Sequence, residues 1–292
     1  MSVTSPCTGI CKLDEATGWC LGCGRSGDEI ADWRSHGDAW RADIWGLIPQ
    51  RLGQLGIACR RLPWTTAEIR AFAADTMRDA RGTWVMGVVG AVAEFTAMPG
   101  AAVDVRMQGD DLIARTRNGA LRMRIDDGVR ALTFDPPGQP GHARVVIAVK
   151  RERGRLPVAD GVADLGEDSE ALLPDPGTRL FDLGLARKEA RFCVRVGEGA
   201  SKDALEAVAD RPFAESLQRI GAPLLSESPT RVVQTALGRV EVQGRIPPPD
   251  GQSQEGPHTH LLPDHLASGC AQPVGMELPR VYLPGAIFYP KR

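Results

Sequence analysis

The first 23 residues carry four of the chain's seven cysteines, in the pattern Cys7-x3-Cys11-x8-Cys20-x2-Cys23. Thiolates two or three residues apart can turn onto one metal ion or cluster, whereas cysteines so close together form relaxed disulfides poorly. Four thiolates are a complete ligand set for Zn²⁺ or for an iron–sulfur cluster. The spacing therefore predicts one metal centre formed by these four side chains.

Ligand type alone does not choose between an iron–sulfur cluster and Zn²⁺. Residues 20–25 look like half of a zinc knuckle, but the three residues between Cys7 and Cys11 depart from the commonest zinc spacing. Against a cluster, the chain lacks the Cys-Pro signature of ferredoxins, because Pro6 precedes its cysteine. The neighbouring cations Lys12 and Arg25 would suit the negative charge of either centre. The sequence is therefore compatible with either an iron–sulfur cluster or Zn²⁺ at this site.

Two short helices are expected after the cysteines. Ser26 and Glu29 form a capping box that starts the first one. The second is predicted over residues 38–48, ended by Pro49. Its apolar stripe would be Trp40, Ile44, Leu47 and Ile48. A unit of about 60 residues with so few large apolar groups has little core of its own, so a bound metal would supply stability.

This N-terminal stretch resembles a bacterial family, domain of unknown function family 1289, whose members are commonly labelled predicted iron–sulfur proteins. The resemblance covers roughly residues 5–52. Its matching residues are Ser5-Pro6-Cys7, Gly9, Cys11, Cys20-x-Gly22-Cys23-x-Arg25, Glu29-Ile30, Trp33 and Leu47-Ile48-Pro49. The resemblance implies a metal site, with iron–sulfur slightly favoured over zinc, and names no reaction.

All six tryptophans lie in the first 84 residues, which indicates that two different modules are joined. We predict a four-cysteine module over residues 1–62 and a larger domain over residues 63–292. The larger domain should begin with a helix capped by Thr65 and Glu68, with Trp64 packed on Ile69.

Short β-type runs follow that helix and predict an antiparallel sheet. They cover residues 103–107, 112–115, 121–125, 130–134 and 144–149. Asn118-Gly119 is the preferred two-residue hairpin turn, because both positions accept a positive φ. Residues 157–177 are rich in acid, Pro and Gly and are predicted to be an exposed connection.

Two more strands, over residues 180–185 and 190–196, are expected to precede a helix interrupted at Arg211-Pro212. A last hairpin should turn around Gly238, and Cys193 should be a packed core thiol. The fold class is thus α+β, a small helical metal-binding module followed by a domain with an antiparallel sheet and flanking helices.

A second candidate site lies near the C-terminus, where three of the five histidines fall within eight residues. His258-x-His260 places both rings on one side of an extended segment, as metal sites often do. His265, Asp264 or Cys270 could supply a third ligand. The alternative is an ordered loop whose histidines hydrogen-bond backbone carbonyls.

A formal charge of −2, from 35 basic and 37 acidic residues, indicates no binding to nucleic acid or to an anionic membrane. An odd number of cysteines, no secretory leader and no apolar run near 18 residues favour the cytoplasm. Nucleotide-binding, P-loop, nucleophile-elbow and zinc-protease motifs are absent, so the sequence does not commit to an enzyme.

The leading hypothesis is a cytoplasmic metal-binding protein whose four-cysteine centre is structural or redox-active. In this hypothesis the larger domain recognises an unidentified protein or small molecule. The alternatives are a zinc-stabilised protein-interaction adaptor and a metal-dependent enzyme that uses His258, His260 and His265.

Overall fold

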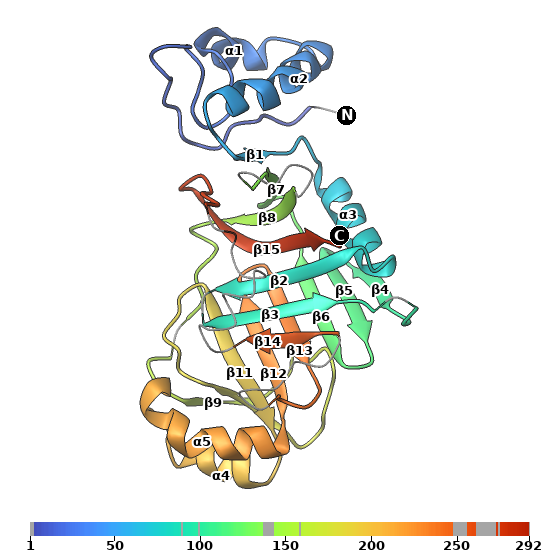
Figure 1. Cartoon of the computed structure of the whole chain (residues 1–292), viewed down its shortest axis with the longest axis vertical. Coiled ribbons are helices and arrows are strands. Elements are labelled where there is room, and N and C mark those ends of the chain that lie inside the picture. The colour runs from blue at the N-terminus through green and yellow to red at the C-terminus, as the bar shows by residue number, and fades with distance from the viewer. Residues whose placement is uncertain are drawn as a thin grey trace.

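The computed structural model describes residues 3–88, 90–98, 100–136, 143–157, 159–247, 256–260, 273 and 275–291. Within these ranges the chain has the predicted α+β fold, with a helical N-terminal module followed by a domain built on two antiparallel sheets. The module with α1 and α2 lies at one end of the molecule and the helices α4 and α5 lie at the other (Figure 1). No helix in these ranges is both long enough and apolar enough to cross a membrane.

The N-terminal module contains α1 (Gly27–Ala31), a 3-10 turn at Asp32–Arg34, and α2 (Asp38–Gln54). The predicted capping box is confirmed. Ser26 Oγ accepts from the Glu29 amide at 3.2 Å, and Glu29 Oε2 accepts from the Ser26 amide at 2.8 Å. These two bonds satisfy amides that the first helical turn leaves without partners.

The predicted end of the second helix at Pro49 is wrong, because α2 continues to Gln54 with Pro49 inside it. Proline removes one amide from the helical ladder, and tertiary contacts beyond it outweigh that loss. Leu52 is only 1% exposed, and Arg51 forms a bidentate ion pair with Glu29. Leu47 of the predicted stripe is 43% exposed. The buried face is instead Ile44, Trp45, Ile48 and Leu52.

The first sheet of the larger domain has seven strands, and β1 and β14 are its edges. In order across the sheet they are β1 (Cys59–Arg61), β7 (Val129–Phe134), β8 (Arg144–Lys150), β15 (Tyr282–Pro290), β2 (Gly82–Val88), β3 (Ala91–Thr96) and β14 (His258–His260). β1 pairs with β7, so this sheet begins before residue 63, where we placed the start of the domain.

The second sheet has eight strands, with β4 and β9 as edges. In order they are β4 (Asp104–Gln108), β5 (Asp111–Thr116), β6 (Gly119–Arg124), β13 (Gly238–Val242), β12 (Thr230–Thr235), β11 (Ala190–Val196), β10 (Arg179–Asp182) and β9 (Ala163–Glu167). The strands predicted over residues 103–149 and 190–196, and the hairpin around Gly238, are confirmed within about two residues at their ends, whereas the strand predicted over residues 180–185 already ends at Asp182.

The main core lies between the two sheets and takes side chains from both, because alternate residues of each strand point inward. α3 (Thr66–Arg78) contributes to this core and begins at the predicted capping box of Thr65 and Glu68. Trp64 packs against Phe72, with ring centroids 4.9 Å apart. At the far end, α4 (Ala200–Glu206) and α5 (Phe213–Glu227) flank β9 to β11, with the predicted break between them (Figure 1).

The β5–β6 turn differs from the prediction by one residue. Arg117 and Asn118 form the two-residue turn, and Gly119 is already paired in β6 with a negative φ. A glycine is needed at position 119 because Pro257 and the backbone of Glu241 lie against it. A Cβ there would lie 2.7 Å from Pro257 Cβ and 2.8 Å from the Glu241 carbonyl oxygen. The tertiary contact therefore accounts for this glycine.

The prediction of an exposed connection over residues 157–177 is wrong in its middle. This segment contains β9 and then covers the outer face of the eight-stranded sheet, where Leu172 is buried. Leu172 packs with Ile113 and Ala120. Asp168 enters a buried cluster of charges on the same face. A buried carboxylate needs cationic partners, and here these partners are distant in the chain. The composition of the segment alone therefore does not predict that Asp168 is buried.

Candidate metal centre

Residues 12–26 fold into a small antiparallel unit that positions two of the predicted ligands. Isolated bridges join Leu13 to Cys20 and Trp19 to Ser26. The Cys20 amide donates to the Arg25 carbonyl at 2.7 Å, which closes a tight turn over residues 20–25. Gly24 has a φ of +70° in this turn, and a Cβ there would lie 3.2 Å from Leu52 Cγ. The turn therefore packs directly on α2.

Cys20 and Cys23 are brought together at this turn. They are 3% and 2% exposed, and their side chains are hydrogen-bonded to each other. The Cys20 sulfur also faces the amides of Gly22 and Cys23. Contact with Cys23 lowers the pKa of Cys20 to about 5, and contact with Cys20 together with burial raises the pKa of Cys23. The two thiols share a proton, which favours a thiolate on one sulfur of the pair.

Cys7 and Cys11 lie on the neighbouring loop. Cys7 is half-buried and its Sγ accepts from the Gly9 amide at 3.4 Å, while Cys11 is exposed. The two loops touch, because a Cβ on Gly22 would lie 2.4 Å from Thr8 Oγ1 and 2.9 Å from Ile10 Cβ. Among the residues that the structure describes, no three His, Cys, Asp or Glu side chains converge closely enough to hold a metal ion. The convergence of all four cysteines stays a prediction.

Two arginines lie beside the thiols without carboxylate partners. Arg25 is buried, donates from Nε to Cys23 Sγ at 3.4 Å and lies 4.6 Å from the centre of the Trp33 ring. Arg61 donates from Nη1 to the carbonyl oxygens of Ser5 and Cys7, and its Nε has no acceptor. Neither guanidinium forms an ion pair within 4.0 Å in the described part of the chain.

A buried cation needs a nearby negative charge, and thiolates are the anions that this site can provide. Burial lowers the pKa of Arg61, as expected for a cation that lacks a close anion. Thr8 Oγ1 is also buried with no hydrogen-bond partner among the described residues, at the contact between the loops. The donors gathered here fit a centre that carries excess negative charge, as four thiolates around a metal would.

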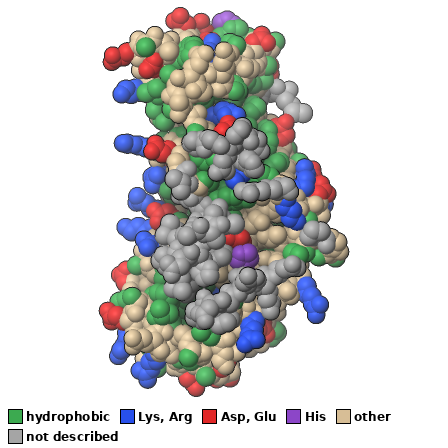
Figure 2. Space-filling view, viewed as in Figure 1, with side chains coloured by type: hydrophobic (Ala, Val, Ile, Leu, Met, Phe, Trp, Pro, Cys, Tyr) green, Lys and Arg blue, Asp and Glu red, His purple; other side chains and the backbone are tan. Residues whose placement is uncertain are grey.

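The cysteine loops also line two clefts against the larger domain. One, of about 750 Å³, lies between Thr8-Gly9 and residues 280–282. Its charged lining residues are Lys150, Arg151, Glu152, Arg155 and Arg280. The other, of about 480 Å³, is lined by Ile10, Leu21 and Gly22 together with residues 56–59, Gly275 and residues 277–280. Figure 2 shows Lys and Arg side chains along the left edge of the molecule in this view, with Asp and Glu side chains between them.

His258 of the second candidate site pairs with a carboxylate. In β14 it lies opposite Glu94 of β3, with Nε2 3.1 Å from Glu94 Oε2 and Nδ1 3.0 Å from the Gly256 carbonyl oxygen. The second bond matches the alternative reading of this segment, in which histidines bond backbone carbonyls. A metal would have to displace one of these partners. The side chain of His260, and all of Asp264, His265 and Cys270, lie outside the described residues.

The His258–Glu94 pair leads to a pH prediction for β14. Burial lowers the pKa of His258, but Glu94 and the Gly256 carbonyl outweigh it, so the folded pKa is raised. The pair therefore stabilises the protein fully below the unfolded histidine pKa of about 6.5, and this contribution is lost as the pH rises through the folded value. We expect His258→Gln to cost about 1–3 kcal/mol in urea unfolding at pH 5.5 and less at pH 8.5.

The control for this prediction is His36→Gln, because His36 is exposed and its ring contacts a backbone carbonyl and Trp40. Its cost should be smaller than that of His258→Gln at pH 5.5, because His36 lies on the surface. An equal cost of His258→Gln at pH 5.5 and pH 8.5 would contradict the assigned pairing.

Sequence reasoning missed a group of four buried charges on the outer face of the eight-stranded sheet. Arg195 Nη2 lies 2.7 Å from Glu241 Oε2 and 2.8 Å from Asp168 Oδ2. Arg239 donates from Nη1 to Asp168 Oδ1 at 3.0 Å, and its Nε lies 2.7 Å from Glu241 Oε1 without hydrogen-bond alignment. The only sequence signal was charged residues inside apolar strands. The four charges neutralise one another, which indicates a structural role.

Comparisons with known proteins match two separate regions of the chain, one in the N-terminal module and one in the larger domain. Residues 5–52 match a family described as protein of unknown function (DUF1289), which confirms the predicted resemblance. The uncharacterized proteins YdhL of Escherichia coli strain K12 and of Shigella flexneri are each 46% identical to this chain over 50 residues. The match covers 17% of this chain and 62% of the length of each relative. No solved structure matches the chain significantly.

The larger domain has its own match, which its sequence pattern had not suggested. Residues 68–292, well over half of the chain, match a family of unknown function (DUF6925). This range contains α3 except its first two residues, and all strands of both sheets except β1. The chain therefore belongs to the DUF6925 family and carries a DUF1289 region before it.

Proposed function

We propose that the N-terminal module is a metal-binding unit in which Cys20 and Cys23 bind the same metal atom, and Cys7 and Cys11 complete the thiolate set. The observation that carries the proposal is the buried, hydrogen-bonded pair of Cys20 and Cys23 with Arg25 against it. Sulfur ligands of one metal atom lie about 3.5–4.5 Å apart, which requires thiols in contact. Arg25 and Arg61 support the proposal, because they balance the charge of such a centre.

The metal is an iron–sulfur cluster or Zn²⁺, with the cluster favoured by the resemblance of residues 5–52. Two cysteines on one metal atom occur in tetrahedral zinc sites and in [2Fe–2S] clusters, where each iron takes two thiolates. A bound cluster would supply electron transfer, and zinc would supply folding stability alone. The chain's own contribution is the same in both cases. Its amides and arginines hold the sulfurs as thiolates.

The larger domain is proposed to bind an unidentified protein or small molecule, in the cytoplasm, where reducing conditions keep the cysteines as thiols. Support comes from the clefts where this domain meets the cysteine loops, since both exceed the roughly 300 Å³ at which ligand pockets begin. A zinc-stabilised adaptor is the alternative for the same surfaces. The enzyme alternative gains no support from His258, whose ring nitrogens both have partners.

The test is metal and sulfide analysis of the full chain purified without air. We expect brown protein that absorbs near roughly 400 nm and contains iron and acid-labile sulfide, all lost in Cys23→Ala. Cys193→Ala, which removes a buried thiol of the larger domain, should keep the colour. Colourless protein with one zinc per chain would support the adaptor alternative. Protein that binds neither metal, whether grown with iron or with zinc, would overturn the proposal.

A further inference from the structure

Arg231 is another buried cation, far along the chain from the cysteines. It lies near the start of β12, opposite Val242 of β13, and is 5% exposed. Its Nη1 donates to the carbonyl oxygens of Pro229 at 2.9 Å and Gly244 at 2.6 Å. These bonds hold the guanidinium in place without neutralising its charge.

A guanidinium has five N–H donors, and the two on Nη1 are used by these carbonyls. No acceptor among the described residues bonds the Nε or Nη2 of Arg231, and no carboxylate there lies within 4.0 Å. Burial alone lowers the pKa of this side chain to about 10, so it is still charged at neutral pH. A desolvated cation without a counter-ion is costly, and it commonly marks the position of an anionic ligand.

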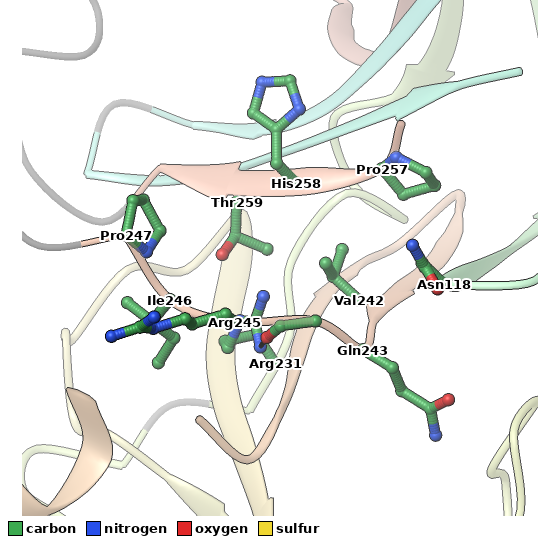
Figure 3. Close-up of a pocket in the computed structure, with 11 residues that line it drawn as sticks. Asn118, Arg231, Val242, Gln243, Arg245, Ile246, Pro247, Pro257, His258 and Thr259 are labelled. Atoms are coloured by element: carbon green, nitrogen blue, oxygen red, sulfur yellow. Dashed lines mark hydrogen bonds between the residues drawn. The ribbon is translucent and has the colours of Figure 1, made fainter. Parts of the chain in front are cut away.

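Arg231 lines a pocket at the edge of the sandwich, between the β12–β13 end of one sheet and β14 of the other. In Figure 3 the Thr259 hydroxyl points into the gap toward Arg231, whereas the His258 ring points away to the opposite side of β14. Asn118 and Arg245 also line the pocket, which adds an amide and a second cation. The enclosed space is about 30 Å³, room for a few atoms, and it opens to solvent.

We propose that this pocket binds the carboxylate or phosphate group of a small molecule, with Arg231 as its main contact. The planar fork of a guanidinium matches two oxygens of such a group, which would take the free donors on Nε and Nη2. The Thr259 hydroxyl, which points into the pocket, would donate to one of these oxygens or to a third oxygen of a phosphate, and the Asn118 amide lines the same pocket. Because only the anionic end fits the enclosed space, the rest of the molecule would lie in the open part of the pocket.

The experiment measures binding of inorganic phosphate and of acetate to the full chain by calorimetry, at constant ionic strength set with chloride. We expect saturable binding of at least one of the two. Binding of phosphate would identify a phosphate group as the ligand, and binding of acetate would identify a carboxylate. Arg231→Gln should weaken it about ten- to hundredfold, and Thr259→Val about three- to tenfold. Arg219→Gln makes the same charge change on the exposed face of α5 and should leave the affinity unchanged.

Several results would overturn the proposal. One is the absence of saturable binding of either anion to the unmodified chain. Another is equal affinity in Thr259→Val and Asn118→Ala, which keep Arg231 and so remain informative even where Arg231→Gln does not fold. A third is binding that occurs only in the double variant Asp250→Asn, Glu255→Gln, because the counter-ion would then belong to the chain itself. None of these results depends on the cysteines, so the metal proposal is tested separately.

Discussion

Cys20→Ser is expected to unfold the N-terminal module while leaving the larger domain folded. In the described part of the module, the core is a cluster of five buried apolar side chains, Trp33, Ile44, Trp45, Ile48 and Leu52. With so small a core, the proposed metal would supply folding energy, which in structural zinc sites is about 10–16 kcal/mol. Differential scanning calorimetry should show one of two transitions disappear. Fluorescence should report the exposure of the tryptophans of this module, since it contains Trp19, Trp33, Trp40 and Trp45.

Two comparisons make this result specific for metal. A chelator added to the unmodified chain should reproduce the loss, because the same binding energy is removed. Cys193→Ala should instead destabilise the larger domain, by about 1 kcal/mol, as expected for a small change in a packed core. The transition of the N-terminal module should not change. The metal assignment fails in the opposite case, in which Cys20→Ser costs about 1 kcal/mol and a chelator has no effect.

Arg195→Met is expected to destabilise the larger domain by about 3–5 kcal/mol. Arg195 is the cation shared by Asp168 and Glu241, and all three side chains are nearly sealed from solvent. Removing it leaves two buried carboxylates with a single arginine, Arg239, between them. Glu241 also accepts the amides of Leu172 and Leu173, so its charge anchors the segment that covers this face of the sheet. Urea unfolding with circular dichroism measures the loss.

Two variants test whether charge, and not volume, causes that loss. Glu241→Gln added to Arg195→Met keeps an acceptor for the Leu172 amide and restores neutrality, so it should recover part of the stability. Arg106→Met removes an arginine that is 71% exposed and paired with Asp104 at 2.8 Å, and it should cost less than about 1 kcal/mol. Equal costs for Arg195→Met and Arg106→Met would contradict the buried ion pairs.

The same cluster makes the domain sensitive to acid. Burial raises the pKa of Asp168, but Arg239 and Arg195 more than offset it, so its folded pKa lies below the ordinary value. A depressed carboxyl pKa gives stability that is present above the unfolded value of about 3.9 and is lost as the pH falls through the folded value. Asp168→Asn should therefore flatten the acid limb of the stability curve below about pH 4, at the cost of lower stability at pH 7.

The sequence by itself determined the features that depend on residues close together in the chain. Ser26 and Thr65 begin helices because a hydroxyl and a carboxylate three residues apart satisfy the first amides wherever the helix lies. Strand positions followed from alternation and from turn residues, which act within a few residues of chain. The cysteine spacing likewise identified the Cys20–Cys23 pair, since a two-residue interval brings two thiols together by itself.

The tertiary structure decided everything that depends on partners distant in the chain. α2 passes Pro49 because Leu52 and Arg51 find contacts in the cysteine turn, and Gly119 is a strand residue because Pro257 approaches it. Asp168 is buried because arginines on two strands neutralise it. Arg231 became a candidate ligand contact only when the described residues around it showed no counter-ion. Burial and charge balance are sums over residues that folding brings together, so local pattern does not contain them.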